Sequence, residues 1–351
     1  MDATRIEWLR ALSDWPRVTL AQLPTSIHRL ANLERHAAGA ELWIKRDALT
    51  GLAGGGNKTR KLEFLVGDAL RNGADMLVTV GAIQSNHTRQ TAAAAARSGL
   101  KAALLHCGWT KDTGPHYRQT GNVLLSSMLG AELYADSRQR PIEDKGPLDQ
   151  LADFLRGRGQ KPYVIPGGAS DHRLGGFGYV VCAAEIAAQS APLGIHFDFV
   201  VHTTGSSSTQ AGLLAGFAML HAKTRVIGIP DDEETSIKRE RVLRLANATL
   251  GELGESKRLG LSEVEIVVGD ASPYGVADAR TMDAIRLLAQ SEGLIADPVY
   301  EGKAVRGLLD LAQAGRFNKG SRVLLLHLGG TPAVHAYANR FGPIDLMPLP
   351  F

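Results

Sequence analysis

Short apolar runs alternate with helical patterns along most of this 351-residue chain, and this alternation constrains the fold more than any other feature. Five runs read as buried strands, at residues 76–80, 101–105, 197–202, 225–229 and 322–327. Helical patterns lie between them, for example at 91–97 and 121–129. Such alternation predicts an α/β fold of parallel sheets with helices on both faces. A ligand then binds in the crevice at the carboxyl ends of the strands.

The composition is that of an ordinary globular protein. With 44% hydrophobic and 21% charged residues, the chain is neither disordered nor fibrous. The formal net charge is only +3 and the basic residues are scattered, so we expect no nucleic-acid partner and no membrane face. No apolar stretch approaches the ~18 residues that span a bilayer. Residues 1–8 include two acidic residues and no apolar run, so we expect no signal peptide and a cytoplasmic protein.

The two cysteines, Cys107 and Cys182, are too few for a disulfide framework and lack the spacing of metal ligands. We expect two packed, reduced thiols and no metal site.

Three segments lack a regular pattern. Glycine pairs at 167–168 and 175–176 bracket a turn-rich stretch where the chain can cross between two lobes. Residues 141–147 read as a surface loop, and the proline-rich tail 342–351 reads as a packed, irregular end.

The segment GGGNKTRK at residues 54–61 is the first candidate for chemistry. Three glycines allow a tight turn and a close backbone approach to a ligand. Asn57 is placed to cap the helix that begins after it. A sheltered lysine at a helix start, here Lys58, loses its proton more easily, and a neutral amine is what Schiff-base chemistry requires. The alternative is a basic helix start with solvated lysines.

The segment GAIQSNH at residues 81–87 places polar side chains at the carboxyl end of a strand. Ser85 can act as a hydroxyl acid or base, and Asn86 can donate to an anionic oxygen. The alternative is simple helix capping by either residue.

The segment TGSSSTQAG at residues 204–212 follows the strand at 197–202 directly. Small hydroxyl residues at a helix start present N–H and O–H donors together, which suits a phosphate. It is neither a Walker A loop nor a dinucleotide fingerprint. A plain serine-rich turn is the alternative.

Two tyrosines lie in loops marked by glycine and proline, Tyr274 in PYG at 273–275 and Tyr300 in DPVYEGK at 297–303. From the residues alone, ordinary half-buried surface tyrosines are the better interpretation.

Together these four segments resemble the β-family (fold type II) of pyridoxal 5′-phosphate (PLP) enzymes. More narrowly, they resemble the group that contains D-cysteine desulfhydrase and 1-aminocyclopropane-1-carboxylate (ACC) deaminase. The resemblance runs from about Leu23 to Tyr337. Its marks are GGNKTRKLEFL from Gly55, GAIQSNHTRQTAA from Gly81, YVIPGGAS from Tyr163, DPVYEGKA from Asp297 and HLGGTPA from His327.

The resemblance implies roles for individual residues. Lys58 matches the Schiff-base lysine, Ser85 a catalytic serine that helps start the reaction, and Asn86 the residue that bonds the ring hydroxyl of the cofactor. Tyr274 and Tyr300 match two active-site tyrosines. The phosphate loop matches Ser206 to Thr209, but its sequence SSST has more side chains than glycine-richer relatives, so the individual donors stay open. The full set expected at the cofactor is Lys58, Asn86, Gly205, Ser206, Ser207, Ser208, Thr209, Glu301, Leu328 and Thr331. Ser85, Asn86, His87, Gln84 and Trp109 are expected at the substrate.

The resemblance also implies a two-domain architecture like that of the tryptophan synthase β-subunit, with parallel-rich, twisted sheets flanked by helices. Residues 1–61 and 170–351 would form the large PLP-binding domain and 62–169 the small domain, with the active site between them. A homodimer is expected, and the only other partner expected is a small amino-acid substrate.

The members of this group act on different substrates, and the sequence marks point to more than one of them. SNHTRQTAA and PGGAS look like the desulfhydrases, whereas Glu301 and Leu328 match the ACC deaminases, and His87 stands where deaminases usually have glutamine. A carboxylate beside the pyridine nitrogen keeps it protonated and makes it a stronger electron sink. We expect β-elimination of the D-cysteine desulfhydrase type, which yields a keto acid and ammonia. The alternatives are ACC deamination, L-cysteate sulfo-lysis, a racemase or dehydratase of this fold, and a PLP-fold protein that binds an amino acid without turnover.

Overall fold

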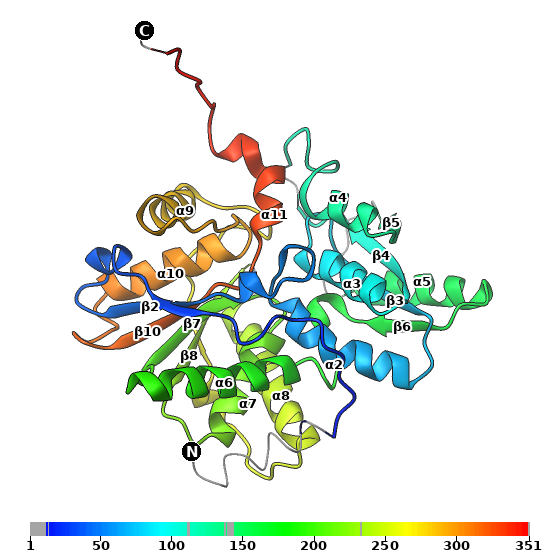
Figure 1. Cartoon of the computed structure of the whole chain (residues 1–351), viewed down its shortest axis with the longest axis horizontal. Helices are drawn as coiled ribbons and strands as arrows, with labels where there is room; N and C mark the ends of the chain where they lie inside the picture. The colour runs from blue at the N-terminus through cyan, green and yellow to red at the C-terminus, as the bar shows by residue number, and fades with distance from the viewer. Residues whose placement is uncertain are drawn as a thin grey trace.

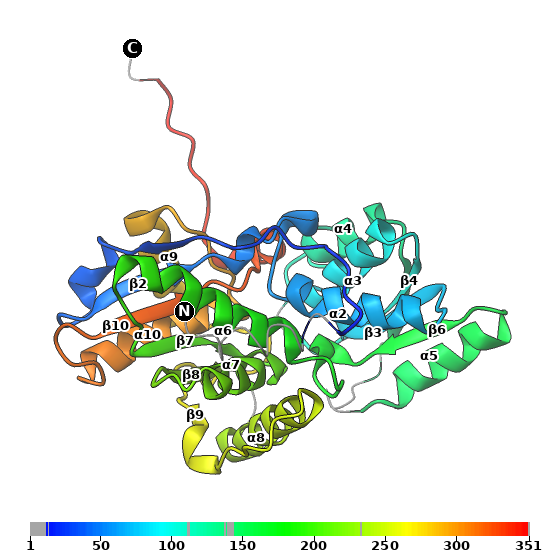
Figure 2. The ribbon, with the colours of Figure 1, turned by 60° about the horizontal axis from the view of Figure 1, so that its bottom comes forward.

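The computed structural model (Figure 1) describes residue 12 and residues 14–110, 113–136, 138, 144–231 and 234–349. Its strands form two sheets that lie side by side along the long axis of the molecule (Figures 1 and 2). The six-stranded sheet has the order β1-β2-β10-β7-β8-β9, and the four-stranded sheet has the order β5-β4-β3-β6. All neighbouring strands are parallel except β1 and β2. The strands are β1 Ile27–Arg29, β2 Glu41–Lys45, β3 Met76–Ala82, β4 Lys101–Cys107, β5 Glu132–Asp136, β6 Pro162–Ile165, β7 Phe199–Thr204, β8 Arg225–Pro230, β9 Glu265–Ile266 and β10 Arg322–Leu326.

The helices follow the strands in the order that a parallel sheet requires. They are α2 Lys58–Arg71, α3 Asn86–Arg97, α4 Gly121–Met128, α5 Gly146–Gly157, α6 Phe177–Ser190, α7 Ser208–Met219, α8 Thr235–Glu252, α9 Ala279–Glu292, α10 Glu301–Gln313 and the short α11 Thr331–Val334. Seven 3-10 helices complete the described elements: η1 Leu33–His36, η2 Asp47–Leu49, η3 Leu52–Gly54, η4 Gly167–Ala169, η5 Ala191–Leu193, η6 Leu261–Glu263 and η7 His335–Arg340.

Alternating side chains of the six-stranded sheet enter two different cores. On β10, Leu324 and Leu326 face the core built with α6, α7 and α8, whereas Val323 and Leu325 face the core built with α9 and α10. This follows from the two-residue period of a strand. Both faces are therefore apolar, which explains why these strands read as continuous apolar runs.

The four-stranded sheet is covered in the same way. Leu77 and Leu104 pack with α2 and α3, whereas Val78 and Leu105 pack against α5 on the other face. The α2 face belongs to the same apolar cluster as the α6 face of the larger sheet. Phe64 of α2 and Phe177 of α6 meet edge to face at 5.5 Å between ring centroids. The two sheets therefore share one core, which fixes the space between their strand ends.

The structure confirms the α/β fold and all five predicted strands. It also confirms the helices expected at 91–97 and 121–129, which lie in α3 and α4. Both cysteines are buried, and neither forms a disulfide with the described residues. The chain leaves the smaller sheet after β6 and enters the larger one after α6, so the crossing occurs in the glycine-rich stretch as expected.

Three local predictions were wrong. Asn57 stands at the N-cap of α2 but its side chain makes no capping hydrogen bond. The loop expected at 141–147 ends early, because Pro147 lies in the first turn of α5, where proline is tolerated; residues 141–143 lie outside the described part. The tail does not pack: Ile344 and Leu346 are about nine-tenths exposed, and the tail extends from the body (Figure 1).

The predicted domain boundaries stay a prediction. The four-stranded sheet draws only on residues 76–165, and α2 runs across the boundary expected between residues 61 and 62. Among the described residues, no helix has the length and apolar character needed to cross a bilayer.

Candidate active site

A cavity of about 300 Å³ lies between the two sheets at the carboxyl ends of their strands. The starts of α2, α3 and α10 line it, as do the segments that follow β7 and β10. The sequence-predicted residues among its lining are Lys58, Asn86, His87, Trp109, Gly205, Ser206, Ser207, Thr209, Tyr274, Tyr300, Glu301 and Leu328. Parallel strands bring these segments together, since all their carboxyl ends meet at one edge of each sheet.

Lys58 is the first residue of α2, and its Nζ donates to Asn57 Oδ1 at 3.0 Å. The pKa of Lys58 is lowered to about 8: burial is the largest cause and Arg89 adds to it, against the carboxylates of Asp231, Glu301 and Asp297, which raise it. About a tenth of the amine is therefore neutral at pH 7, far more than for a solvated lysine. That is the state in which a lysine attacks a carbonyl.

Lys61 lies one turn further along α2 and is fully buried. Its Nζ donates to Ser208 Oγ at 2.7 Å and to Ser206 Oγ at 3.4 Å, at the start of α7. No acidic side chain in the described part of the chain pairs with it, and burial, together with Lys58, lowers the pKa of Lys61 well below its usual range. An anion bound beside this amine, the hydroxyl groups and the helix N-terminus would favour the protonated form of Lys61, so the arrangement is a site for an anion.

The loop between β7 and α7 presents further donors to the same place. Ser207 adopts a left-handed conformation with φ of 64°, and its Oγ is buried without a partner among the described residues. Thr204 Oγ1 is likewise buried and unpartnered. Gly205 is held by Lys238, whose Nζ donates to the Gly205 carbonyl at 2.9 Å. This loop therefore offers unfilled hydrogen-bonding capacity to an anion.

Glu301 begins α10 and is 1% exposed, and neither carboxylate oxygen forms a hydrogen bond to the described residues. Burial, with the neighbouring charge of Asp297, raises the pKa of Glu301 well above its usual range. A buried carboxyl group that lines a cavity without a partner needs a donor from a ligand. Asp297 positions this helix start, because its Oδ1 accepts from the backbone N–H groups of Val299 and Tyr300 at 2.8 and 2.9 Å.

Two tyrosine hydroxyls meet in the cavity wall, where Tyr274 and Tyr300 share a hydrogen bond. Burial raises the pKa of Tyr274 well above its usual range, and the neighbouring Tyr300 raises it further. Trp109 follows β4 in the smaller sheet and packs edge to face on Tyr274, with 6.3 Å between ring centroids. The tyrosines, interpreted from the residues alone as surface groups, thus line the cavity.

The start of α3 supplies Asn86 and His87 to the cavity. Asn86 Oδ1 is buried without a partner in the described residues, so it is available to a ligand. Ser85 acts as the N-cap of α3, and its Oγ accepts from the backbone N–H groups of His87 and Thr88 at 3.2 and 3.3 Å. The structure gives Ser85 the capping role; its catalytic role stays a prediction.

Four predicted residues do not line the cavity: Ser85, which caps α3, and three others. Gln84 points to α4, where its Nε2 donates to the Tyr117 and Thr120 carbonyls at 2.6 and 2.9 Å. Thr331 is exposed at the start of α11. Ser208 lies behind the loop and meets Lys61. The sequence motifs correctly place these residues near strand ends. The direction of each side chain, which the motifs do not give, decides whether it lines the cavity.

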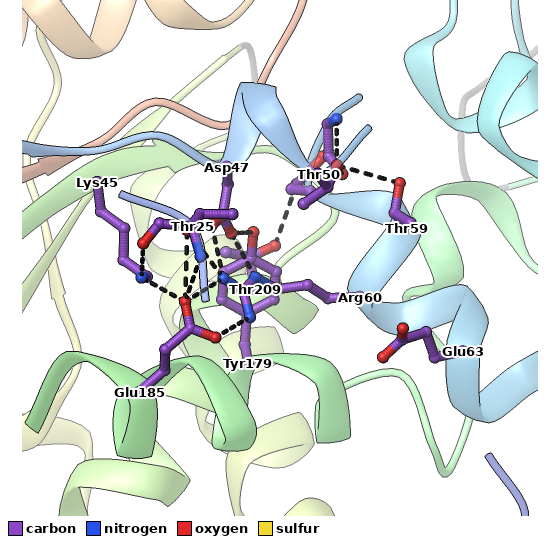
Figure 3. A network of polar contacts seen from close by, with 12 residues as sticks. Thr25, Lys45, Asp47, Thr50, Thr59, Arg60, Glu63, Tyr179, Glu185 and Thr209 are labelled. Atoms are coloured by element: carbon purple, nitrogen blue, oxygen red, sulfur yellow. Dashed lines mark hydrogen bonds and ion pairs between the residues drawn. The ribbon is translucent and has the colours of Figure 1, made fainter. Parts of the chain in front are cut away.

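Beside the site, Arg60 anchors α2 in a buried network (Figure 3). Its guanidinium forms two 2.8 Å hydrogen bonds to Asp47 and two more to Glu185, at 3.0 and 2.9 Å. Tyr179 also donates to Asp47, at 2.7 Å. Burial acts to raise the pKa of Asp47, but Arg60, Lys45 and Tyr179 together outweigh it, so that the pKa lies below its usual value. Lys45 completes the network through Glu185.

The cavity fits PLP at three separated points. Lys58 offers an amine of lowered pKa, Lys61 with the Ser206–Thr209 loop offers an anion site, and Glu301 offers an unpartnered carboxyl group. These match the aldehyde, the phosphate and the pyridine nitrogen of the cofactor. In the described residues, no group of three or more His, Cys, Asp or Glu side chains is arranged to hold a metal ion.

The family profile described as "Pyridoxal-phosphate dependent enzyme" matches residues 18–329. This chain belongs to the pyridoxal-phosphate-dependent enzymes. Its cofactor is therefore PLP, as predicted.

Within this PLP family, the chain is similar to proteins named 1-aminocyclopropane-1-carboxylate deaminase. It is 43% identical to the one from Burkholderia lata, over 94% of this chain and 98% of the relative. It is also 43% identical to the one from Methylobacterium nodulans, over 94% and 99%. The crystal structure of an ACC deaminase homologue has a TM-score of 0.87 at 36% identity, covering 97% of this chain and 99% of that one. The fold type II architecture is thereby confirmed.

Sequence reasoning missed the role of Lys61 in this PLP enzyme, although the residue stands in the first motif. The signal was present, since Lys61 falls three residues after Lys58 on one face of a helix. It also missed Asp297, which stands at the head of the fourth motif and organises the start of α10.

Proposed function

We propose that this PLP enzyme deaminates 1-aminocyclopropane-1-carboxylate, converting ACC and water to the four-carbon keto acid 2-oxobutanoate and ammonia. This was the alternative expectation, and it now stands ahead of D-cysteine desulfhydration. The observation that carries it is Glu301, buried, unpartnered and in the same cavity as Lys58 and Leu328. The names of the relatives at 43% identity support it.

When bound, PLP supplies an electron sink for a bond broken at the substrate α-carbon. Glu301 then serves to hold the pyridine nitrogen in its protonated form, since a buried carboxyl group of raised pKa is stabilised by a cationic donor. Leu328 keeps this end of the cavity apolar. A strained carbon ring lacks a good leaving group, so its opening depends on this stronger sink.

Lys58 would be the residue that moves a proton at the substrate when its amine is free. Its pKa of about 8 allows it to accept a proton near neutral pH and to release it again. Tyr274 and Tyr300 share a hydrogen bond in the cavity wall, so one hydroxyl can supply a proton while the other stabilises the resulting oxygen. Asn86 Oδ1 and the Ser206–Thr209 loop would fix the cofactor, by its ring hydroxyl and its phosphate respectively.

D-cysteine breakdown remains the second candidate because of His87. This residue lines the cavity where ACC deaminases usually have glutamine. Thr79 Oγ1 donates to the Ile165 carbonyl at 2.7 Å and so accepts from His87 Nε2, also at 2.7 Å. That tautomer leaves Nδ1, which has no partner among the described residues, as an acceptor. D-cysteine carries a thiol that a neutral imidazole can accept from, whereas ACC carries no such group.

A substrate panel tests the proposal. Purified protein loaded with PLP would be assayed with ACC, D-cysteine and L-cysteate, and scored for keto acid and ammonia. We expect 2-oxobutanoate from ACC at the highest kcat/KM. Pyruvate from D-cysteine alone would establish the second candidate, and a protein that binds PLP but releases no keto acid from any of the three would refute both.

We also infer a homodimer located in the cytoplasm, as the family resemblance implies. The exposed apolar tail supports a second copy, because Ile344, Leu346 and Met347 are each about nine-tenths exposed. Light scattering of the full chain and of a chain ending at residue 341 would test this, with a dimer expected for the first and a larger monomer fraction for the second.

A further inference from the structure

The start of α2 is capped by a side chain from another helix. The residue at the N-cap, Asn57, directs its side chain elsewhere: its Nδ2 donates to Thr209 Oγ1 at 3.4 Å and its Oδ1 accepts from Lys58 Nζ. The backbone N–H of Thr59 is shared between two acceptors, the Gly56 carbonyl at 3.2 Å and Gln90 Oε1 of α3 at 2.9 Å. The Thr59 hydroxyl donates to the same Gln90 oxygen at 3.1 Å. Gln90 therefore supplies the nearer acceptor at the start of the helix that begins with Lys58.

The amide nitrogen of Gln90 is also hydrogen-bonded. Its Nε2 donates to the carbonyl of Asn86 at 3.0 Å, one turn back in α3. Turning the amide over would place its NH₂ group against the Thr59 N–H and its oxygen against a carbonyl. Because Gln90 is fully buried, no water replaces either bond. The Gln90 amide therefore forms both hydrogen bonds in one orientation only. It also requires that α2 and α3 keep their present positions relative to each other.

The segment between these contacts carries the reactive lysine. Gly56 packs against the Gln90 side chain so closely that an added Cβ would lie 2.5 Å from Nε2. From the opposite side, Thr50 Oγ1 accepts from the Gly56 N–H at 2.8 Å and donates to the Gly56 carbonyl at 2.9 Å. Figure 3 shows Thr50 and Thr59 facing one another at this helix start. Lys58 therefore sits between two residues whose backbones are both held.

We propose that Gln90 is a positioning residue: by capping α2 from α3, it fixes the Lys58 amine relative to the Asn86 and His87 face of the cavity. The proposal rests on the proposed function only in assigning Lys58 as the cofactor lysine. Gln90 itself does not line the cavity. It acts through two helices, one that carries the lysine and one whose first turn faces the substrate.

Three variants test this in the PLP-loaded full-length protein. Gln90→Met keeps the volume but removes the oxygen that accepts from Thr59. Gln90→Glu keeps that oxygen and, when protonated, can still donate to the Asn86 carbonyl. Thr91→Val is the matched control, because Thr91 is the next residue of α3 and is fully buried. Its hydroxyl donates to the His87 carbonyl of its own helix at 2.9 Å, the one side-chain bond it makes to the described residues.

The first readout is the pH titration of the visible absorbance band of the cofactor–Lys58 link, which needs no turnover. For Gln90→Met we expect its midpoint to fall, since the negative end of the amide dipole at the helix start has been removed. The second readout is kcat, which we expect to fall about 10-fold with little change in KM, as for a misplaced reacting group. Gln90→Glu should restore both quantities towards the parent, and Thr91→Val should leave both unchanged.

An unchanged titration midpoint in a folded Gln90→Met protein would overturn the proposal, as would equal effects from Gln90→Met and Thr91→Val. If Gln90→Met does not fold, Thr59→Val removes one of the two hydrogen bonds from the α2 side, and the same downward shift, smaller in size, is expected. The absorbance titration can be measured and interpreted even if the protein turns over none of the candidate substrates. Failure of the proposed function and failure of this inference are therefore distinguishable.

Discussion

Lys61 Nζ lies 2.7 Å from Ser208 Oγ, and within the described part of the chain this buried ammonium has no carboxylate partner. Removing a charge from water is costly unless an opposite charge compensates it. We expect the PLP phosphate, bound beside the start of α7, to supply that charge. Lys61 and Lys58 share one helix, and we expect them to serve opposite ends of the cofactor.

Loss of Lys61 should release the cofactor. Lys61→Met leaves the phosphate without its buried cation, a loss of about 3–5 kcal/mol, or more than about 100-fold in PLP affinity. Thr209→Ala removes a single donor to a charged group, about 1.5–3 kcal/mol, or roughly 10- to 150-fold. Dialysis followed by absorbance measures both. Lys145→Met, at the exposed rim of the cavity, is the control, and equal retention by all three variants would contradict this phosphate site.

Borohydride reduction of the PLP-loaded protein should attach the cofactor permanently to Lys58. Peptide mapping by mass spectrometry would locate the label. Lys61 is the natural competitor because it is buried in the same helix and its pKa is also lowered. A label on Lys61 would show that the two lysines had been assigned the wrong way round.

Uptake of PLP by the cofactor-free protein should depend on pH through Lys58. Its pKa is lowered from 10.5 to about 8, so the neutral amine that attacks the aldehyde becomes the major form above pH 8. The rate of appearance of the visible band should rise about tenfold per pH unit below 8 and level off above about 9. A rate that keeps rising to pH 10 would indicate an ordinary solvated lysine.

Glu301 and Leu328 should together set the reaction preference. Glu301→Ser combined with Leu328→Thr weakens the hold on a protonated pyridine nitrogen, whereas a thiolate leaves without a strong electron sink. The double variant should lose ACC deamination and keep or gain D-cysteine breakdown, as measured by keto acid release. Should the parent not act on ACC and the double variant also lose activity on D-cysteine, Glu301 would be a general requirement of the site.

The Arg60 network should stabilise the fold in a pH-dependent way. Asp47→Asn removes the more buried of the two carboxylates that bind Arg60 and leaves Glu185 in place, so we expect a loss of about 3 kcal/mol, the lower end of the range for a broken buried pair, in the free energy of unfolding at pH 7. The Asp47 pKa is depressed in the folded state, so its contribution is complete above the unfolded value of 3.8 and is lost as pH falls through the lower folded value.

Urea unfolding of the parent and variant at several pH values checks this, with a gap that narrows only below about pH 4. Asp283→Asn is the matched control, because its ion pair with Arg286 is on the surface and should contribute less than about 1 kcal/mol. A gap that stays constant down to pH 2 would show that Asp47 acts through packing alone.

Much of the fold was predictable because the signals are local. Strands β3, β4, β7, β8 and β10 are apolar on both faces. That pattern is expected of a strand that helices cover on two sides. Motifs directly after β3 and β7 had to meet at the carboxyl edges of the sheets. Predictions failed where a side chain had a choice of direction, as at Asn57, which turns to Thr209 instead of capping its own helix.

The sequence by itself determined that a lysine follows three glycines at a helix start, and that polar segments end the neighbouring strands. Those facts depend on residues within about one turn of each other. Only the tertiary structure decided which lysine meets the serine loop 147 residues away, and that Gln90 caps Thr59 from 31 residues further along. Such contacts depend on how α2, α3 and α7 pack around a shared core. A local pattern records the period of each helix, but it does not record the neighbour against which that helix lies.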